Sequence, residues 1–538
     1  MIYKGNFKFS DDMVVPGLLN ILDSKYSGYK CNLILDHIDV KGEIIIEKKC
    51  QTDTIIYGTL ENGTNVTLVA FLPNIVSVNG ISTFNIELKS LYLNGLLNYN
   101  ERNKFEFKEL VVNFSSLHRW IDFSDPRSTI DTNLGIPLTH FDDLHMELFY
   151  DDPYVPEDKP LRGYRSLYLR IFSDDTTSMD MDKLMKFVHK IQDFFNLLYH
   201  EEVLINSVYG YKQSRQNRIQ IFASYYHPQR MRKPPIGFAF QSLFNSSENN
   251  TDAFKLQTLG SILHNYFELA KNTEGRYMFL DFFFDVMYDH GSREENLFLS
   301  LCGFFESFYE YKYGAQMDTN KSTRKELFTQ IKNLIQSQIP DSDYRKKAIG
   351  LLAMFQKPSF QEQIREVFQI TADIAPYWSS MIKYFDEVEI RKSIKTFEKR
   401  PEMSNNIEFI ISKSKEIWIT NNIYTKSLKI NCLKEALHIC SETNLKLQEY
   451  IKFLFTEQIP REIITYRNDF AHGNFNTDRK ENEIRYAKKI IQLVDILHLI
   501  ARLCILRELG YSKEKLLCLY LLKNSNLDRY NLILNLNI

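Results

Sequence analysis

The sequence lacks the features that would place the chain in a membrane or outside the cell. No segment has 18 consecutive apolar residues, and the most apolar one, Leu493–Leu506, contains Asp495, His498 and Arg502. It therefore predicts a buried helix of a water-soluble protein. The first residues, Met1–Asp12, contain no hydrophobic core of a signal peptide and end on two acidic side chains. We therefore expect a cytoplasmic protein that does not contact a membrane.

Cysteine is scarce, and its spacing is typical of neither disulfides nor zinc sites. The seven cysteines are an odd number, and none forms a Cys-x-x-Cys pair. Cys432, His438 and Cys440 lie close in sequence, but this spacing matches no common zinc pattern. On a helix, the two cysteines would join an apolar face. We therefore expect buried thiols in a reducing compartment and no metal site.

The chain also lacks a strong net charge and the motifs of nucleotide-driven enzymes. Its formal net charge is −2, with 25% charged residues. A protein that coats long stretches of nucleic acid is usually more basic, so any contact with nucleic acid is expected to be local. There is no Gly-rich phosphate loop, no G-x-S-x-G and no kinase signature. We therefore expect neither ATP-driven chemistry nor a cofactor.

The N-terminal part of the sequence has the pattern of a β protein. Up to about residue 175, short apolar or alternating runs are separated by turn signals such as Glu61–Gly63 and Asn79–Gly80. This pattern predicts an antiparallel sandwich or barrel. The expected strands include Glu43–Glu47, Ile55–Leu60, Val66–Phe71, Thr83–Leu88, Phe105–Phe114, His145–Tyr150 and Ser166–Phe172.

The pattern becomes helical towards the C-terminus, with an almost continuous helical signal from about Glu294. The change predicts an α+β protein. A β-rich N-terminal domain would cover residues 1–290, with a mixed α/β part at 176–290, and an all-α helical bundle would cover residues 291–538. A strand is expected at Ile219–Tyr225. The expected helices are Met181–Tyr199, Ala253–Ala270, Tyr277–Tyr288, Glu294–Tyr311, Arg324–Gln338, Ser342–Phe355, Phe360–Thr371, Leu433–Phe455, Glu483–Leu509 and Ser512–Leu522.

A short polar segment between two of these helices has residues suited to RNA cleavage. Arg467 and His472 lie between Pro460, which suits the first turn of a helix, and Gly473, which suits its end. A histidine can remove the proton of a ribose 2′-OH, and a guanidinium can stabilise the charge that develops on the attacked phosphate. Asn468 could hold the histidine or a phosphate oxygen.

The spacing of this arginine and histidine has a second interpretation. An arginine and a histidine separated by four to six residues are expected about once or twice by chance in such a chain. Arg467 and Asp469 could be solvated surface charges. His472 could be a residue at a helix C-terminus, stabilised by the helix dipole. The residues alone leave both interpretations open.

Two parts of the chain resemble known families. In its helical setting, Arg467–His472 resembles the signature of the HEPN ribonucleases: an arginine, a polar residue, a short spacer and a histidine. The N-terminal half resembles the β-rich domain of ApeA-type anti-phage proteins. The segments that carry this second resemblance are Val14–Leu19, Gly58–Leu60, Val66–Leu68 and Ser116–Trp120.

The HEPN resemblance implies a metal-independent endoribonuclease. Arg467 and His472 would be its catalytic pair, with Asn468 and Asp469 in supporting positions. Family members often have an acidic residue on an early helix that contacts the motif, and Glu306 is the candidate here. An exposed helical position without that role is the alternative for Glu306. The resemblance also implies a homodimer or higher homo-oligomer, in which two motifs face each other.

The ApeA resemblance implies a role in defence by abortive infection. Such a protein would stop phage growth by attacking host RNA, with tRNA as a plausible target. The N-terminal domain would sense a phage-encoded trigger or restrain the nuclease. Two other hypotheses remain: a non-catalytic HEPN module that binds RNA or a nucleotide, and the toxin of a toxin–antitoxin pair.

A basic segment offers a second candidate contact with RNA. No acidic residue lies between Glu202 and Glu248, and the basic residues there alternate with tyrosines. Basic and aromatic side chains together suit single-stranded RNA, although a solvated loop is the alternative. The residues proposed to bind RNA are Arg215, Arg218, Arg230, Arg232 and Lys233.

Overall fold

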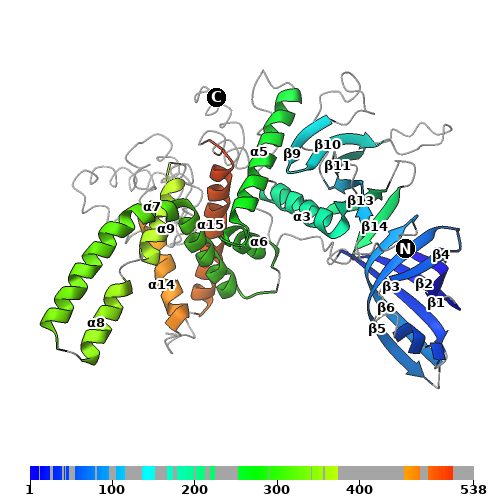
Figure 1. Ribbon diagram of the computed structural model, residues 1–538, viewed down its shortest axis with the longest axis horizontal. Coiled ribbons are helices and arrows are strands. Elements are labelled where there is room, and N and C mark those ends of the chain that lie inside the picture. Colours follow the sequence, from blue (N-terminus) through cyan, green and yellow to red (C-terminus); the bar gives the residue numbers. More distant parts are fainter. Residues whose placement is uncertain are drawn as a thin grey trace, which may run out of the picture. The chain divides into compact units, whose positions relative to one another are not determined.

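The computed structural model divides into two compact units, Met1–Phe267 and Glu268–Ile538 (Figure 1). Strands dominate the first unit and helices the second, which confirms the predicted α+β class. The division falls inside helix α5 (Asp252–Thr273), earlier in the chain than residue 290. The structure describes residues 1–10, 12–24, 28–38, 41–42, 44–47, 55–78, 81–95, 105–115, 136–151, 166–173, 179–198, 202–212, 218–223, 252–289, 291–340, 342–354, 358–373, 454–472, 483–512 and 516.

Six antiparallel strands at the N-terminus close into a barrel. Their order is β3-β2-β1-β4-β5-β6, and β3 also pairs with β6, which completes the ring. The strands are β1 (Ile2–Ser10), β2 (Met13–Ser24), β3 (Gly28–Ile38), β4 (Ile55–Leu60), β5 (Asn65–Val78) and β6 (Ile81–Leu93). The hairpin turn between β4 and β5 contains Gly63 at a φ of 81°, a backbone conformation that glycine adopts at little cost.

Alternating apolar residues fill the barrel interior. Along β1, Phe7 and Phe9 are buried while their neighbours in sequence are more exposed, as expected of a strand with one face in a core. Phe7 lies opposite Gly58 of β4, where an added Cβ would lie 2.6 Å from the Phe7 ring. The ring thus takes the space that glycine leaves. The core also contains Leu19, Leu33, Leu35, Leu68, Phe84, Ile86 and Leu88.

The long strand β6 joins the barrel to a second stretch of sheet. Its first part pairs with β3, up to Leu88 opposite Cys31, and its last residues pair with β14, from Ser90 opposite Ala223. The sheet continues from there in the order β14-β13-β8-β11-β10-β9. These strands are β8 (Glu109–Phe114), β9 (Ile136–Phe141), β10 (Leu144–Asp151), β11 (Ser166–Ser173), β13 (Ile205–Tyr211) and β14 (Ile219–Ala223).

Two helices cover one face of this second stretch through aromatic contacts. Helix α3 (Met181–Leu198) places Phe195 5.3 Å from the ring of Phe114 on β8. Its Phe187 stacks on Phe267 of α5, with ring centroids 4.5 Å apart, and Phe267 lies 5.0 Å from Phe141 of β9. The apolar face of the sheet is thus buried under α3 and α5.

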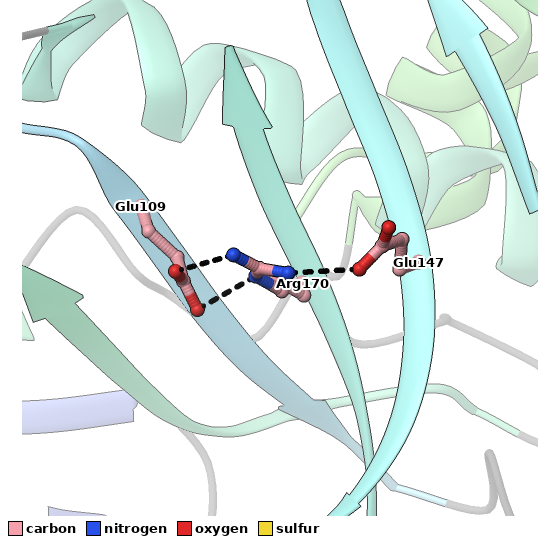
Figure 2. Close-up of polar contacts among 3 residues, drawn as sticks. All are labelled: Glu109, Glu147 and Arg170. Carbon is pink, nitrogen blue, oxygen red and sulfur yellow. Dashed lines mark hydrogen bonds and ion pairs between the residues drawn. The ribbon is translucent and has the colours of Figure 1, made fainter. Parts of the chain in front are cut away.

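The opposite face of the sheet carries a three-strand ion cluster (Figure 2). Arg170 of β11 makes two contacts with Glu109 of β8, at 2.8 and 2.9 Å, and one with Glu147 of β10, at 2.9 Å. Its guanidinium carbon lies 4.2 Å from the ring centroid of Phe172. Burial alone would lower the pKa of Arg170, but its hydrogen bonds and ion pairs with the two carboxylates raise it. We call these four residues the Arg170 cluster.

The second unit is helical around an aromatic core. Phe279 of α6 packs edge-on against Phe304 and Phe308 of α7, at 5.8 and 5.1 Å between ring centroids. The described helices of this unit are α6 (Phe279–Tyr288), α7 (Glu294–Gln338), α8 (Asp343–Met354), α9 (Phe360–Ile370), the π-helix η3 (Leu454–Gln458), α14 (Ile459–His472) and α15 (Glu483–Glu508). None of the helices in the described part of the chain combines the length and apolar character needed to cross a membrane.

The structure corrects two predictions of local structure. The predicted strand Glu43–Glu47 is wrong, because residues 44–47 are helical, with Ile46 buried and Ile44 largely exposed. Three successive isoleucines favour a strand locally, but tertiary packing overrides that preference. Helix α7 is continuous where two helices, Glu294–Tyr311 and Arg324–Gln338, were predicted. Most of the predicted helices Leu433–Phe455 and Ser512–Leu522 lies outside the described residues.

Candidate functional site

Helix α14 carries the predicted motif and begins as the sequence indicates. Pro460 is its second residue, where a missing N–H costs little, and the π-helix η3 immediately precedes it. Ile459 and Ile463 are buried one turn apart. Arg467 lies one further turn along the same face, so the buried stripe that anchors the helix leads directly to this side chain.

Arg467 forms an ion pair with Glu306. Its Nη2 donates to Oε1 of Glu306 at 2.6 Å, and the two side chains are 31% and 40% exposed. Glu306 lies on α7 next to Phe305, which is fully buried. The pair therefore joins two helices at a position that water reaches, 161 residues apart in sequence.

An aromatic ring lies against the same guanidinium. The guanidinium carbon of Arg467 is 4.1 Å from the ring centroid of Phe360, within the range of a cation–π contact. Phe360 is the first residue of α9, which begins with a capping box. Ser359 accepts a hydrogen bond from the backbone N–H of Glu362, and the carboxylate of Glu362 accepts one from the N–H of Ser359. We call Arg467, Glu306 and Phe360 the Arg467 cluster.

Ion pairs and a ring contact fix α14 and its surroundings around this cluster. Arg365 of α9 contacts Glu457 of η3 at 3.0 Å. Lys489 of α15 contacts Glu462 of α14 at 2.8 Å, and both of these side chains are mostly buried. At the other end of α14, Phe470 lies 5.8 Å from Phe298 of α7 between ring centroids. Three helices thus hold α14 in place (Figure 1).

A buried thiol lies one turn before Glu306 on α7. Burial raises the pKa of Cys302 to about 12, while the positive charge of Arg467 lowers it and the carboxylate of Glu306 raises it. At neutral pH the thiol is therefore protonated and a poor nucleophile. Cys31, Cys302 and Cys504 are all buried and free, as predicted, and the other four cysteines lie outside the described residues.

The structure places the other predicted site residues as follows. Asn468 is exposed and Asp469 half-buried, both on α14 beside Arg467. His472 is the last residue of α14, and its side chain lies outside the described part. Arg218 belongs to the first unit, where its guanidinium carbon lies 3.4 Å from the ring centroid of Tyr209. Arg215, Arg230, Arg232 and Lys233 lie outside the described residues.

Reasoning from the sequence missed Phe360 as a member of the site. The pattern Ser359-x-x-Glu362 is the signature of a capping box and marks the start of a helix. It does not show that the first residue of that helix meets an arginine 107 positions later. Among the described residues, no group of three or more histidine, cysteine, aspartate or glutamate side chains could hold a metal ion.

The Arg467 cluster is suited to binding an anion. A guanidinium has five N–H donors in a planar fork that fits carboxylate and phosphate oxygens. At Arg467, one carboxylate contacts one end of the fork, and the centroid of an aromatic ring lies 4.1 Å from the guanidinium carbon. The half-exposed position leaves the cluster within reach of a solute. The 2.6 Å contact with Glu306 shows that the guanidinium binds a carboxylate oxygen in this position.

Comparison with known proteins concerns the first unit. Residues 2–256 match the family model described as ApeA N-terminal domain 1. This region is therefore similar to that domain family, in agreement with the resemblance seen in the N-terminal half. The match ends before the helical unit begins. No curated protein and no solved structure matches the chain.

Proposed function

We propose that the chain is an ApeA-type anti-phage protein whose helical unit is a metal-independent HEPN endoribonuclease. The ApeA N-terminal domain 1 match supports the first part of the proposal. The Arg467 cluster supports the second, because the arginine of the motif is held in place by two side chains from other helices. That arrangement is the single observation that favours a functional arginine over a solvated surface charge.

The proposed reaction needs one base and one cation. His472 removes the proton of a ribose 2′-OH, and the resulting alkoxide attacks the adjacent phosphorus. The P–O5′ bond breaks and the leaving 5′-oxygen takes a proton from water, so the products carry a 2′,3′-cyclic phosphate and a 5′-OH. Arg467 binds the phosphate oxygens as their charge increases. Asn468, which follows Arg467 and is exposed, is in a position to contact the same RNA.

The biological setting follows from the two resemblances. The RNA would belong to the host, with tRNA as the proposed target, and its cleavage would stop phage growth. The first unit would respond to a phage-encoded trigger or restrain the nuclease. Two copies of the chain would bring two motifs together in a homodimer or larger homo-oligomer.

One observation favours a second candidate, a HEPN module that binds RNA or a nucleotide without cleaving it. The carboxylate of Glu306 already neutralises part of the charge of Arg467. A guanidinium in an ion pair can bind an anion without taking part in catalysis. A toxin of a toxin–antitoxin pair, the third candidate, would require an antitoxin encoded beside it.

The test replaces Arg467 and His472 separately with alanine in the full chain. Both variants should lose RNA cleavage and protection against phage while remaining folded. Arg461→Ala is the matched control, since Arg461 lies on the same helix, is half-exposed and pairs with Glu457 rather than with Glu306. It should cleave as the unchanged protein does. Full protection by folded Arg467→Ala and His472→Ala would contradict the nuclease proposal, and RNA binding without cleavage by the unchanged protein would favour the second candidate.

A further inference from the structure

We infer that Phe360 is a positioning residue for Arg467, whose ring fixes the plane of the guanidinium that binds the phosphate. The inference deepens the proposed function and rests on it. The hydrogen bond to Glu306 contacts the guanidinium at one nitrogen, Nη2, and this contact by itself leaves the plane able to turn. The ring of Phe360, 4.1 Å from the guanidinium carbon, contacts a different part of the group.

Edge and face contacts together define an orientation. A carboxylate attracts the N–H groups at the edge of a guanidinium, whereas an aromatic ring attracts its flat face. An arginine side chain has many rotamers, so an unheld guanidinium would have to be ordered at the moment of reaction. A misplacement of about 1 Å at a reacting centre can cost on the order of 100-fold in rate. A ring that orders the group beforehand reduces that loss.

Phe360 can serve in this way because its own position is fixed. The capping box holds the backbone on both sides of it, through the 2.7 Å hydrogen bond from the N–H of Ser359 to Glu362. Three buried side chains of α9, Ile364, Val367 and Phe368, anchor the rest of the helix.

The helices that carry the Phe360 ring and the Glu306 carboxylate also pack against each other. Phe368 of α9 lies 5.5 Å from Phe305 of α7 between ring centroids, and Phe305 is the residue before Glu306. The packing of α9 on α7 therefore sets the separation of the two groups that hold Arg467. Phe360 lies beside the guanidinium because the two helices are packed together, and not by chance orientation of a surface side chain.

The experiment compares Phe360→Leu with Phe360→Tyr in the full chain. Leucine keeps the apolar bulk and removes the aromatic face, whereas tyrosine keeps both. Phe360→Leu should lower kcat about ten-fold with little change in KM, since the lost interaction acts mainly on the transition state. Phe360→Tyr should restore kcat to within about two-fold of the unchanged protein.

The matched control is Tyr277→Leu. Tyr277 is also half-buried in the helical unit and lies under a different arginine, Arg276, at 5.0 Å, with its ring 5.6 Å from that of Tyr311. Its loss should leave kcat and KM unchanged. Equal kcat for Phe360→Leu and the unchanged protein would overturn the inference, and so would a Phe360→Tyr variant as impaired as Phe360→Leu.

A second readout does not depend on RNA cleavage. The Nε–Hε signal of Arg467, assigned in the NMR spectrum of arginine-labelled protein by its loss in Arg467→Lys, should shift in Phe360→Leu because the ring current is removed. It should shift much less in Tyr277→Leu. An unchanged signal in Phe360→Leu would overturn the inference even if the protein is a nuclease. A shifted signal in a chain that cleaves no RNA would refute the proposed function and leave the geometry standing.

Discussion

The Arg170 cluster and the Arg467 cluster contain the same kinds of groups. In each, a guanidinium carbon lies about 4 Å from a phenylalanine ring, at 4.2 Å for Arg170 and 4.1 Å for Arg467. They differ in the number of carboxylates that contact the guanidinium. Arg170 contacts two carboxylates through three nitrogen–oxygen contacts (Figure 2), whereas Arg467 contacts one carboxylate among the described residues.

The cluster with fewer carboxylates is also the more exposed to solvent. The side chain of Arg170 is 20% exposed, with its carboxylates at 11% and 18%, whereas Arg467 and Glu306 are 31% and 40% exposed. A guanidinium between two sheltered carboxylates stabilises the pairing of three strands. A guanidinium with one carboxylate, nearer to water, keeps capacity for a further anion. We therefore expect Arg170 to stabilise the fold, and we propose that Arg467 serves the function.

The largest effect is expected from Arg170→Ala, on stability. It leaves Glu109, which is only 8% exposed, without its guanidinium partner. We expect the local free energy of unfolding of the sheet to fall by about 3 kcal/mol. Hydrogen–deuterium exchange of the full chain, read at β8, β10 and β11, measures it. If this free energy falls by less than about 1 kcal/mol, Arg170 does not have the stabilising role that distinguishes it from Arg467. An equal fall in Arg461→Ala would have the same meaning.

Arg467→Lys tests, through RNA cleavage, whether the Arg467 cluster serves the function. Lysine keeps the positive charge but loses the planar fork that can contact a carboxylate, a ring and a phosphate together. We expect RNA cleavage to fall about ten-fold or more, which corresponds to about 1.4 kcal/mol, with stability nearly unchanged. Initial rates and a urea unfolding curve of the same preparation separate the two effects. Unchanged rates would show that charge alone suffices.

Glu306→Gln should have a smaller effect, because glutamine can still accept a hydrogen bond from Arg467. We expect cleavage to fall a few-fold and stability to change by less than about 1 kcal/mol, as is usual for exposed ion pairs. The matched change in the other cluster is Glu109→Gln, which should lower stability more and leave cleavage unchanged. The comparison fails if the two substitutions affect stability to the same extent.

The smallest effect concerns pH and belongs to the β-rich unit alone. Burial lowers the pKa of His189 on α3, while a hydrogen bond with Gln192 partly opposes it. The folded state therefore binds fewer protons than the unfolded state, and stability is lost as pH falls below the ordinary histidine pKa of about 6.5. His189→Gln should flatten this loss in unfolding curves recorded between about pH 7.5 and 5.5. An equally steep loss in the variant would exclude His189 as its source.

Local signals in the sequence located many elements well. Ile55–Leu60 was predicted as a strand and is β4, and Phe360–Thr371 differs from α9 by one residue. The spacing of apolar residues is enough to predict a strand or a helix where one face of that element packs against a core. The strands β1 to β3 were not predicted, because the turns between them lack the Asn-Gly signal and long-range pairing with β4 and β6 defines them.

The candidate site shows the same limit. The sequence supplied Arg467 and His472 as a motif and Glu306 through a family resemblance. It could not supply Phe360, because the contact depends on how α9 packs against α7 through Phe305 and Phe368. Nor could it distinguish Arg170 from Arg467, since saturation by carboxylates is a property of strand register and helix packing.

Metal-independent cleavage by Arg467 is tested most directly at the ends of RNA after incubation with the protein in EDTA. Unchanged protein and folded Arg170→Ala should both give 2′,3′-cyclic phosphate and 5′-OH ends, detected by mass spectrometry, and Arg467→Ala should give neither. Cleavage by Arg467→Ala at the unchanged rate would contradict the account, as would products with 5′-phosphate ends or the loss of all cleavage in EDTA.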